Sequence, residues 1–172
     1  ELDKDGEAIY IRAEYIAGLP PRLKKHFRRR SRWFCFEFRD RFVRTPIPLP
    51  RPRTFSIDWK GVFWCILTRE FCQWIVSDDF VKKCSRYLRH TKIPDELIMP
   101  TLVMNSPFRD SMAFDDKREV IWTGKPHPKT LTMDDHDRLL ASNAFFARKF
   151  DENVDRDILF ALADRIGAEP AS

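Results

Sequence analysis

This sequence has few glycines, no long apolar run and no start signal. Only 5 of its 172 residues are glycine, and no low-complexity tract interrupts the chain. Few glycines together with 43% apolar residues favour a folded chain over a disordered one. No window approaches the roughly 18 consecutive apolar residues that a membrane span needs. The chain opens on Glu1, with neither an initiator methionine nor a signal peptide, so we expect one domain excerpted from a longer protein.

Cysteine pairs that would bind a metal are also missing. The four cysteines form no CxxC pair, and no nearby histidine completes a zinc spacing; they are Cys35, Cys65, Cys72 and Cys84. Each sits among large apolar neighbours, where a free cysteine usually behaves as a small hydrophobic residue. The pattern predicts reduced, buried thiols in a reducing compartment.

Short catalytic signatures are absent as well. The chain has no glycine-rich phosphate loop and no nucleophile elbow, and its four histidines stand in no recognisable relation to a nucleophile. Residues 133–137 (MDDHD) look like a metal cluster, but acids are common at a helix start, and side chains on one helix cannot all reach one ion. Solvated turns account for the pairs Asp78-Asp79 and Asp115-Asp116. We therefore expect no metal site.

Positive charge is concentrated in one segment. Residues 22–53 hold twelve Arg or Lys against two acids, whereas the whole chain has a net charge of +5. Aromatic residues are interleaved with these bases, namely Trp33, Phe34, Phe36, Phe38 and Phe42. Bases neutralise phosphates and aromatic faces stack on nucleobases, so the segment is a candidate surface for nucleic acid, anionic lipid or a sugar nucleotide. The alternative is a strand that buries Phe34, Phe36 and Phe38 on one face, with solvated arginines around it.

The spacing of apolar residues predicts strands that alternate with helices, an α/β architecture. Strands are expected at 61–67 (GVFWCIL), which is typical of a fully buried strand, and at 101–105 and 119–122. Helices are expected after Thr68, after Ser77 with Asp78 and Asp79, and over 132–142 and 154–166. The second of these helices places Phe80, Val81, Cys84 and Leu88 on one face, and the last runs through Val154, Ile158, Leu162 and Ile166. Alternate prolines in residues 45–55 favour extended backbone, either an exposed linker or an irregular loop crossing the core.

Two adjacent carboxylates stand out in residues 93–108 (IPDELIMPTLVMNSPF). Asp95 and Glu96 lie between Pro94 and a run of large apolar residues. Proline and acids are both favoured in the first turn of a helix, which explains the pair structurally. A carboxylate held at the mouth of a site to accept a proton explains it equally well. These residues alone leave both interpretations open.

Four motifs, taken in order, resemble the core-2/I-branching glycosyltransferase family. They are residues 61–69 (GVFWCILTR), 94–106 (PDELIMPTLVMNS), 118–122 (REVIW) and 145–151 (FFARKFD). The family includes β-1,6-N-acetylglucosaminyltransferases and peptide O-xylosyltransferases, and the ARKFD ending looks like that of bacterial members. The resemblance spans roughly residues 57–165. It implies that 57–172 form the C-terminal part of a catalytic domain, and that 1–56 are a basic, proline-rich segment of the same domain.

The resemblance implies a reaction and assigns residues to it. Members are similar to GT-A enzymes, with a mixed sheet flanked by helices, and transfer a sugar from a UDP donor with inversion. Glu96 matches the family's catalytic base, and Asp95 would orient the loop or bind the acceptor. Arg118 and Lys149 match the pair that stabilises the leaving diphosphate in place of a metal, so no cofactor beyond the UDP-sugar is implied.

Four further residues are weaker candidates. Trp122 would stack on a sugar ring or pack in a core. Asn105 and Ser106 would hydrogen-bond near the site or close a strand into a turn. Arg69 would extend the positive pocket or cap its own helix.

The chain also departs from the family pattern. Val62 stands where a serine is common, Ile121 where bacterial relatives often have an acid, and Pro100 would disturb a helix begun at Pro94. The family's N-terminal half, which forms much of the uridine pocket, is not recognisable in residues 1–56. By itself the fragment is therefore expected to bind donor poorly or not to catalyse transfer.

The resemblance leaves partners and location broad. The sugar would be N-acetylglucosamine or xylose, and the acceptor a glycan, a polysaccharide or a protein hydroxyl. A bacterial protein would be cytoplasmic or membrane-associated, and a eukaryotic one would belong to a Golgi-type membrane. The alternative function is a non-enzymatic basic module that binds nucleic acid or an anionic surface through residues 22–53.

Overall fold

The computed structural model describes residues 8–39, 41–124 and 126–167, which belong to two compact units. Unit 1 ends at Asp116 and unit 2 begins at Lys117. The division predicted between the basic segment 1–56 and residues 57–172 of the same domain falls inside unit 1. There the first strand of the chain pairs with a strand that follows that division.

Unit 1 contains a three-stranded sheet in the order β4-β1-β5. Its strands are β1 (Ile9–Tyr15), β4 (Trp59–Ile66) and β5 (Met112–Ala113). β1 runs antiparallel to β4 and parallel to β5, so the centre of the sheet comes from the start of the chain. Ile9 and Ile11 on β1 are fully buried and belong to the main core.

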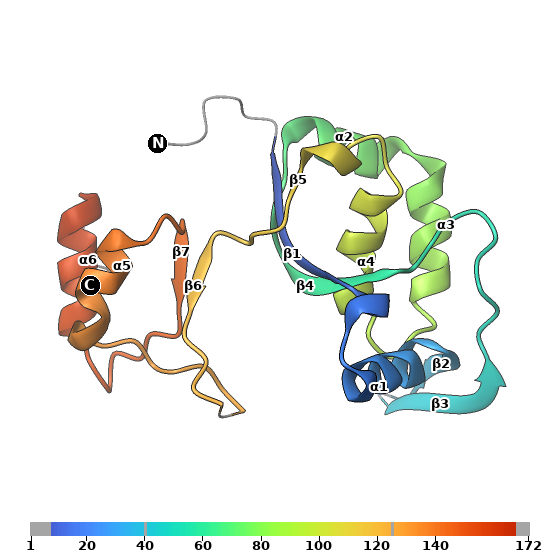
Figure 1. Ribbon diagram of the computed structural model, residues 1–172, viewed down its shortest axis with the longest axis horizontal. Helices are drawn as coiled ribbons and strands as arrows, with labels where there is room; N and C mark the ends of the chain where they lie inside the picture. The colour runs from blue at the N-terminus through green and yellow to red at the C-terminus, as the bar shows by residue number, and fades with distance from the viewer. Residues whose placement is uncertain (1–7, 40, 125, 168–172) are drawn as a thin grey trace. The chain divides into compact units, whose positions relative to one another are not determined.

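Helices α2 (Arg69–Ser77), α3 (Asp79–Leu88) and α4 (Pro94–Met104) follow β4 in unit 1 (Figure 1). Helix α4 packs against β4, and α3 packs on α4. The predicted caps of α2 and α3 are confirmed. Thr68 Oγ1 accepts a hydrogen bond from the Phe71 N–H at 3.2 Å, and the Asp78 carboxylate accepts one from the Phe80 N–H at 2.7 Å. The predicted inner face of α3 is confirmed at its buried members, Val81, Cys84 and Leu88.

The strand predicted at 101–105 is wrong, because these residues belong to α4 or its end. Leu97 and Met99 to Val103 are all buried, and a short run that is apolar on every side does not distinguish a buried strand from a buried helix. Pro100 was expected to disturb a helix begun at Pro94, yet the helix continues through it. Its ring packs where Gly61 of β4 has no side chain.

The predicted strand at 61–67 is confirmed as β4, but its full burial is wrong. Phe63 and Trp64 are both more than half exposed. Both lie where the pairing of β4 with β1 is irregular, between Gly61 and Cys65. Apolar composition therefore identified the strand and misjudged its surroundings.

The basic segment folds into a helix and a hairpin. Helix α1 (Pro21–Ser31) was not predicted, and it is followed by β2 (Trp33–Phe38) and β3 (Arg41–Pro48), which form an antiparallel pair. The predicted burial of Phe34, Phe36 and Phe38 on one face is wrong. Cys35 is the fully buried residue of β2, and because successive side chains alternate in direction, Phe36 and Phe38 are exposed.

The proline-rich segment is divided between two kinds of structure. Its first residues, through Pro48, continue β3, which within the described part of the chain pairs with β2 alone and so tolerates proline. The remainder, from Leu49 to Asp58, has no helix or strand and leads to β4. We call residues 49–58 the connector.

Unit 2 contains a parallel pair, β6 (Arg118–Val120) and β7 (Phe146–Arg148), with helices α5 (His136–Ala141) and α6 (Asp157–Ile166). The strand predicted at 119–122 is confirmed only through Val120. The stripe predicted for the last helix is wrong at its ends, where Val154 precedes the helix and Ile166 is 77% exposed. Of the four residues in the predicted stripe, Ile158 is the fully buried one. Among the described residues, no helix is both long and apolar enough to cross a membrane.

All four cysteines are free. The predicted burial holds for Cys35 and Cys84, whereas Cys65 is half-buried and Cys72 is exposed. Burial raises the pKa of the Cys84 thiol to about 12, which keeps it protonated and unreactive at neutral pH. The prediction of buried thiols is therefore wrong for Cys72.

Candidate functional site

The carboxylate pair lies in the first turn of α4, in unit 1. Pro94 is the first helical residue, Asp95 is exposed, and Glu96 is half-buried. Ile93 precedes them and offers no side-chain cap, so the two acids supply the negative charge that complements the helix N-terminus. This confirms the helix-start interpretation and leaves the catalytic role of Glu96 a prediction.

The backbone around Glu96 is held on a rigid support. The next residue, Leu97, is fully buried, which fixes this turn of the helix against the core. Pro100 has no N–H and cannot donate the intrahelical hydrogen bond to the Glu96 carbonyl. Two prolines thus bracket the carboxylate, and the helix between them places its side chain at the rim of the core.

Asn105 and Ser106 stabilise the end of α4 and its neighbourhood. The side-chain oxygen Oδ1 of Asn105 accepts a hydrogen bond from the Ser56 N–H at 2.9 Å. Its Nδ2 donates to the Ser56 carbonyl at 3.0 Å and to the Thr101 carbonyl at 2.8 Å. Ser106 Oγ donates to the Val103 carbonyl at 2.8 Å. Both residues therefore close the end of α4, and Asn105 also holds the connector. The expected role of closing a strand into a turn is wrong, because the element that ends here is a helix.

Arg69 and Trp122 are both exposed. Arg69 is the first residue of α2, but the cap of that helix is Thr68, so a capping role for Arg69 is wrong. Trp122, in unit 2, is 58% exposed, which excludes the alternative of core packing. Its ring remains available for a ligand.

Arg118 and Lys149 belong to unit 2, where Arg118 lies on β6 and Lys149 directly follows β7. Arg118 begins β6 and pairs with Phe146 of β7, whereas Lys149 follows the end of β7. Since Arg118 pairs with Phe146, the backbone of Lys149 lies three residues further along, about 10 Å in the strand direction. Lys149 is exposed, and its carbonyl accepts from the Leu131 N–H at 2.8 Å.

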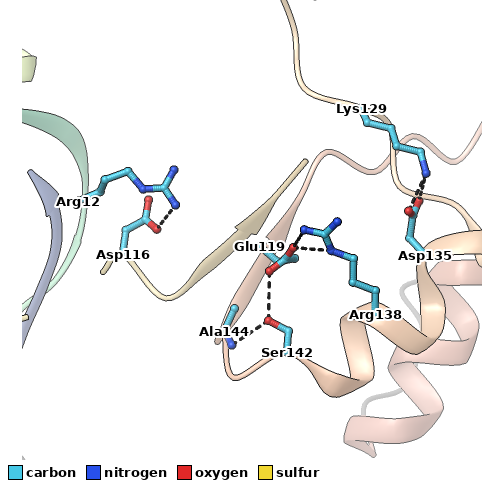
Figure 2. A network of polar contacts seen from close by, with 8 residues as sticks. All are labelled: Arg12, Asp116, Glu119, Lys129, Asp135, Arg138, Ser142 and Ala144. Atoms are coloured by element: carbon cyan, nitrogen blue, oxygen red, sulfur yellow. Dashed lines mark hydrogen bonds and ion pairs between the residues drawn. The ribbon is translucent and has the colours of Figure 1, made fainter. Parts of the chain in front are cut away.

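A polar network that the sequence analysis missed links α5 to β6 in unit 2 (Figure 2). Arg138 donates from Nε and Nη2 to Glu119 Oε1 at 2.9 and 2.6 Å, and Ser142 Oγ donates to Glu119 Oε2 at 3.3 Å. The same Ser142 oxygen accepts from the Ala144 N–H at 3.1 Å. Glu119 directly follows Arg118, so this network fixes the strand that carries the candidate arginine. No sequence motif joined residues so far apart.

The acids of 133–137 support the fold of unit 2. Asp135 is buried, and the Lys129 ammonium donates to both of its oxygens at 2.6 and 2.7 Å (Figure 2). Asp135 also accepts from the Thr132 N–H and completes a capping box with Thr132. The Lys129 hydrogen bond holds the pKa of this carboxyl below its usual value. Across the described residues, no group of three or more histidines, cysteines or acids is arranged to hold a metal ion.

Asp116 corrects the interpretation of the pair 115–116 as a solvated turn. Asp116 is only 5% exposed, and Arg12 Nη2 of β1 lies 3.3 Å from its Oδ1 (Figure 2). The contact is an ion pair whose geometry falls short of a hydrogen bond. It fastens the last residue of unit 1 to that unit's central strand.

Unit 1 also contains a cavity of about 700 Å³, which no motif indicated. Residues of α1, the connector and α3 line it, and none of the predicted site residues does. Its wall includes Arg32 and Arg51 from the basic segment.

With this geometry in place, the chain can be compared with known proteins. A family model described as Core-2/I-Branching enzyme matches residues 23–141. The chain belongs to the Core-2/I-Branching enzyme family. The match confirms the resemblance and the α/β fold class. It begins at residue 23, so residues 23–56 belong to the match although no likeness was expected there, and it ends at residue 141, before the motif at 145–151.

Curated relatives of this Core-2/I-Branching member are named as glycosyltransferases. Xylosyltransferase 1 of Rattus norvegicus is 28% identical over 130 residues, which cover 64% of this chain and 16% of the relative. Beta-glucuronosyltransferase GlcAT14B of Arabidopsis thaliana is 30% identical over 120 residues, which cover 63% and 27%. Xylosyltransferase 2 of Rattus norvegicus is 28% identical over 121 residues, which cover 59% and 14%. The chain thus spans less than a third of the length of each of these relatives.

Proposed function

We propose that this chain is part of an inverting glycosyltransferase that moves a sugar from a UDP-sugar donor to a hydroxyl acceptor. The observation that carries the proposal is the family match over 23–141, which includes the helix that bears Glu96. The names of the curated relatives support sugar transfer as the reaction class.

Glu96 is the proposed general base. Its carboxylate removes the proton from the acceptor hydroxyl while that oxygen attacks the anomeric carbon. The new glycosidic bond forms as the bond from the anomeric carbon to the UDP oxygen breaks, so one displacement inverts the configuration. A base on a helix is better positioned than one on a mobile loop, and the buried Leu97 and the two flanking prolines support that role. Asp95, exposed beside it, is proposed to bind or orient the acceptor.

Arg118 and Lys149 are proposed to stabilise the departing UDP. Negative charge grows on the diphosphate as the bond to the sugar breaks, and two fixed cations lower the energy of that state. A guanidinium binds phosphate oxygens in a bidentate manner, and an ammonium adds a compact charge. We propose that this pair replaces a metal ion, and that Trp122 offers its exposed ring to a sugar.

The donor sugar is proposed to be N-acetylglucosamine or xylose. The acceptor would be a hydroxyl of a glycan, a polysaccharide or a protein. Attachment to a membrane, in a bacterial or a Golgi-type setting, would be a property of the full-length protein.

Calorimetric titration of UDP into the chain, with a chelator present, tests the diphosphate site. We expect binding that survives the chelator, is lost in the Arg118→Ala/Lys149→Ala variant, and is retained in Glu96→Gln. In the full-length protein, Glu96→Gln is expected to lower transfer by at least about a hundredfold, the lower range for a general base.

Two results would contradict this assignment. Normal transfer by Glu96→Gln would remove Glu96 as the base. UDP binding that requires a divalent cation, or that persists in the double variant, would remove the metal-free diphosphate site. A full-length protein that binds no UDP would end the proposal altogether.

The second candidate function is binding of nucleic acid or an anionic surface through the basic hairpin. The observation in its favour is that Phe36 and Phe38 are exposed on β2, with the Arg39 guanidinium 5.4 Å from the centre of the Phe38 ring. This function predicts salt-dependent binding to duplex DNA or anionic vesicles that Arg41→Glu/Arg44→Glu abolishes. The Arg118→Ala/Lys149→Ala variant serves as the control and should bind normally. Unchanged binding after the hairpin charge reversal would exclude it.

A further inference from the structure

The connector forms a fixed wall of the cavity in unit 1. In Figure 1 it leaves β3 and passes α3 before it reaches β4. The Leu49 N–H donates to the Arg32 carbonyl at 2.7 Å, which ties the start of the connector to the end of α1. The Ile16 N–H donates to the Asp58 carbonyl at 2.8 Å, which ties its end to the turn after β1. A segment that its composition would assign to a loose linker is therefore anchored at both ends.

The middle of the connector is anchored as well. The Asn105 side chain bonds both the N–H and the carbonyl of Ser56. Next to it, the Phe55 ring meets the rings of Phe80 and Tyr87 edge-on, at centroid distances of 5.6 and 5.8 Å. These contacts hold the cavity open without a ligand, which is the usual condition of a binding site for a small molecule.

The polar groups that line the cavity favour an anion that also carries hydroxyl groups. Two basic residues, Arg32 and Arg51, line the cavity, against one acidic residue, Asp58. Burial raises the pKa of the Tyr87 phenol and the charge of Arg51 opposes that rise, so the Arg51 charge acts on the Tyr87 side of the cavity. Ser31 Oγ donates to the Phe27 carbonyl at 3.1 Å and keeps its lone pairs as acceptors.

We propose that this cavity binds an acidic oligosaccharide, a chain of sugars that bears carboxylate groups. Arg32 and Arg51 would bind the carboxylates, since a guanidinium matches a planar carboxylate with two parallel N–H donors. Asp58, Ser31 and Tyr87 would bind sugar hydroxyls. A volume of about 700 Å³ has room for more than one sugar ring and far exceeds a free inorganic anion.

The aromatic residues of the cavity bear on the choice between a saccharide and a nucleotide. A nucleobase binds best to an aromatic face that it can stack on. Phe27 is only 4% exposed and Phe55 already contacts two other rings, whereas Tyr87 is half-buried, so displacement by UDP is the experiment that separates the two ligands. None of the residues assigned to transfer lines this cavity, so the proposal does not depend on the transferase assignment.

Binding of trigalacturonate tests the proposal, with maltotriose as a neutral saccharide of the same length. The chain is titrated with each sugar in 150 mM salt by calorimetry, and amide shifts are followed by NMR. We expect saturable binding of trigalacturonate, much weaker binding of maltotriose, and shift changes at Phe55 and Tyr87. Arg51→Ala should weaken trigalacturonate binding about tenfold, the loss of one charge-assisted hydrogen-bonded contact.

Arg53→Ala is the matched control. Arg53 is an exposed arginine of the same connector that does not line the cavity, so its removal lowers the net charge equally. It should change the affinity by less than about twofold. Equal losses in Arg51→Ala and Arg53→Ala, shift changes confined to the β2–β3 hairpin, or no binding would overturn the proposal.

UDP provides the last arm of the test. If UDP displaces trigalacturonate and its own binding falls in Arg51→Ala, the cavity is a nucleotide site and the saccharide proposal is wrong. If UDP binds without displacing trigalacturonate, the saccharide proposal stands. The Arg118→Ala/Lys149→Ala titration addresses the transferase assignment separately, so failure of one proposal is distinguishable from failure of the other.

Discussion

At Gly61 the strand β4 lies close to Pro100 of α4. A Cβ atom built there would lie 2.5 Å from the Arg12 carbonyl oxygen and 2.8 Å from Pro100 Cγ. Real side chains do not tolerate such distances, and one of the two neighbours is backbone. The absence of a side chain at this position therefore allows a proline-containing helix to pack against the sheet.

Substitution of this glycine should destabilise unit 1. We expect Gly61→Ala to lower the free energy of unfolding by about 1–3 kcal/mol, the usual cost of overpacking, as measured by urea denaturation. Gly18→Ala is the control, because a Cβ at Gly18 has nothing within 4 Å. That variant should change stability by less than about 1 kcal/mol, in either direction. Equal stability of the two variants would show that β4 and α4 separate easily.

At the scale of single residues, the sequence predicted the features that depend on residues close by in the chain. The cap at Thr68 and the acids in the first turn of α4 follow from local preferences, and both are confirmed. The burial of Asp116 and the clamp from Asn105 to Ser56 could not be predicted. Their partners lie far away in the chain, and no alternation or motif indicates which distant residue will meet them.

At the scale of elements, the cap at the start of helix α2 can be tested by substitution. Thr68 is buried, and its hydroxyl satisfies one of the N–H groups that helix α2 leaves unpaired at its start. Thr68→Ala should cost about 1 kcal/mol of stability, as measured by urea denaturation, because that N–H loses its partner. Thr68→Ser keeps the hydroxyl and should recover most of the loss. Equal stability of the Ala and Ser variants would mean that the cap contributes nothing measurable.

Elements were predicted well where polar residues mark their ends and poorly where they do not. Helices α2 and α3 begin at side-chain caps, a capping box at Thr132 opens the 3-10 turn that leads into α5, and the sequence located all three helices. The residues from Thr101 onward continue α4 without any such mark, and they are as buried as a strand interior would be. Helix α1 was not predicted, because many of its residues are basic and its buried apolar residue is Phe27. One such residue gives no helical pattern that the sequence could show.

Across the whole molecule, hydrophobic burial is divided between the two units. The main buried cluster comes only from residues of unit 1, from Ile9 to Val103. In unit 2, Leu131 and Ile158 are fully buried. Asp155 joins the two parts of that unit, since its carboxylate accepts from the Met133 N–H at 2.8 Å and from the Ile158 N–H at 3.3 Å. A substitution in one core is therefore expected to act on its own unit.

Ile158→Ala should unfold unit 2 selectively. Loss of a buried isoleucine side chain costs about 2–5 kcal/mol, and a unit of about 50 residues has only about 3–8 kcal/mol of stability. Hydrogen exchange measures the result, because the Leu131 amide is bonded within unit 2 and the Cys35 amide, which donates to the His90 carbonyl at 2.8 Å, within unit 1. We expect protection to be lost at Leu131 and kept at Cys35. Ile166→Ala on the same helix, at a largely exposed position, should leave both amides protected. Equal loss at Leu131 and Cys35 in Ile158→Ala would mean that the units unfold together, and that Arg118 and Lys149 depend on the folding of the whole chain.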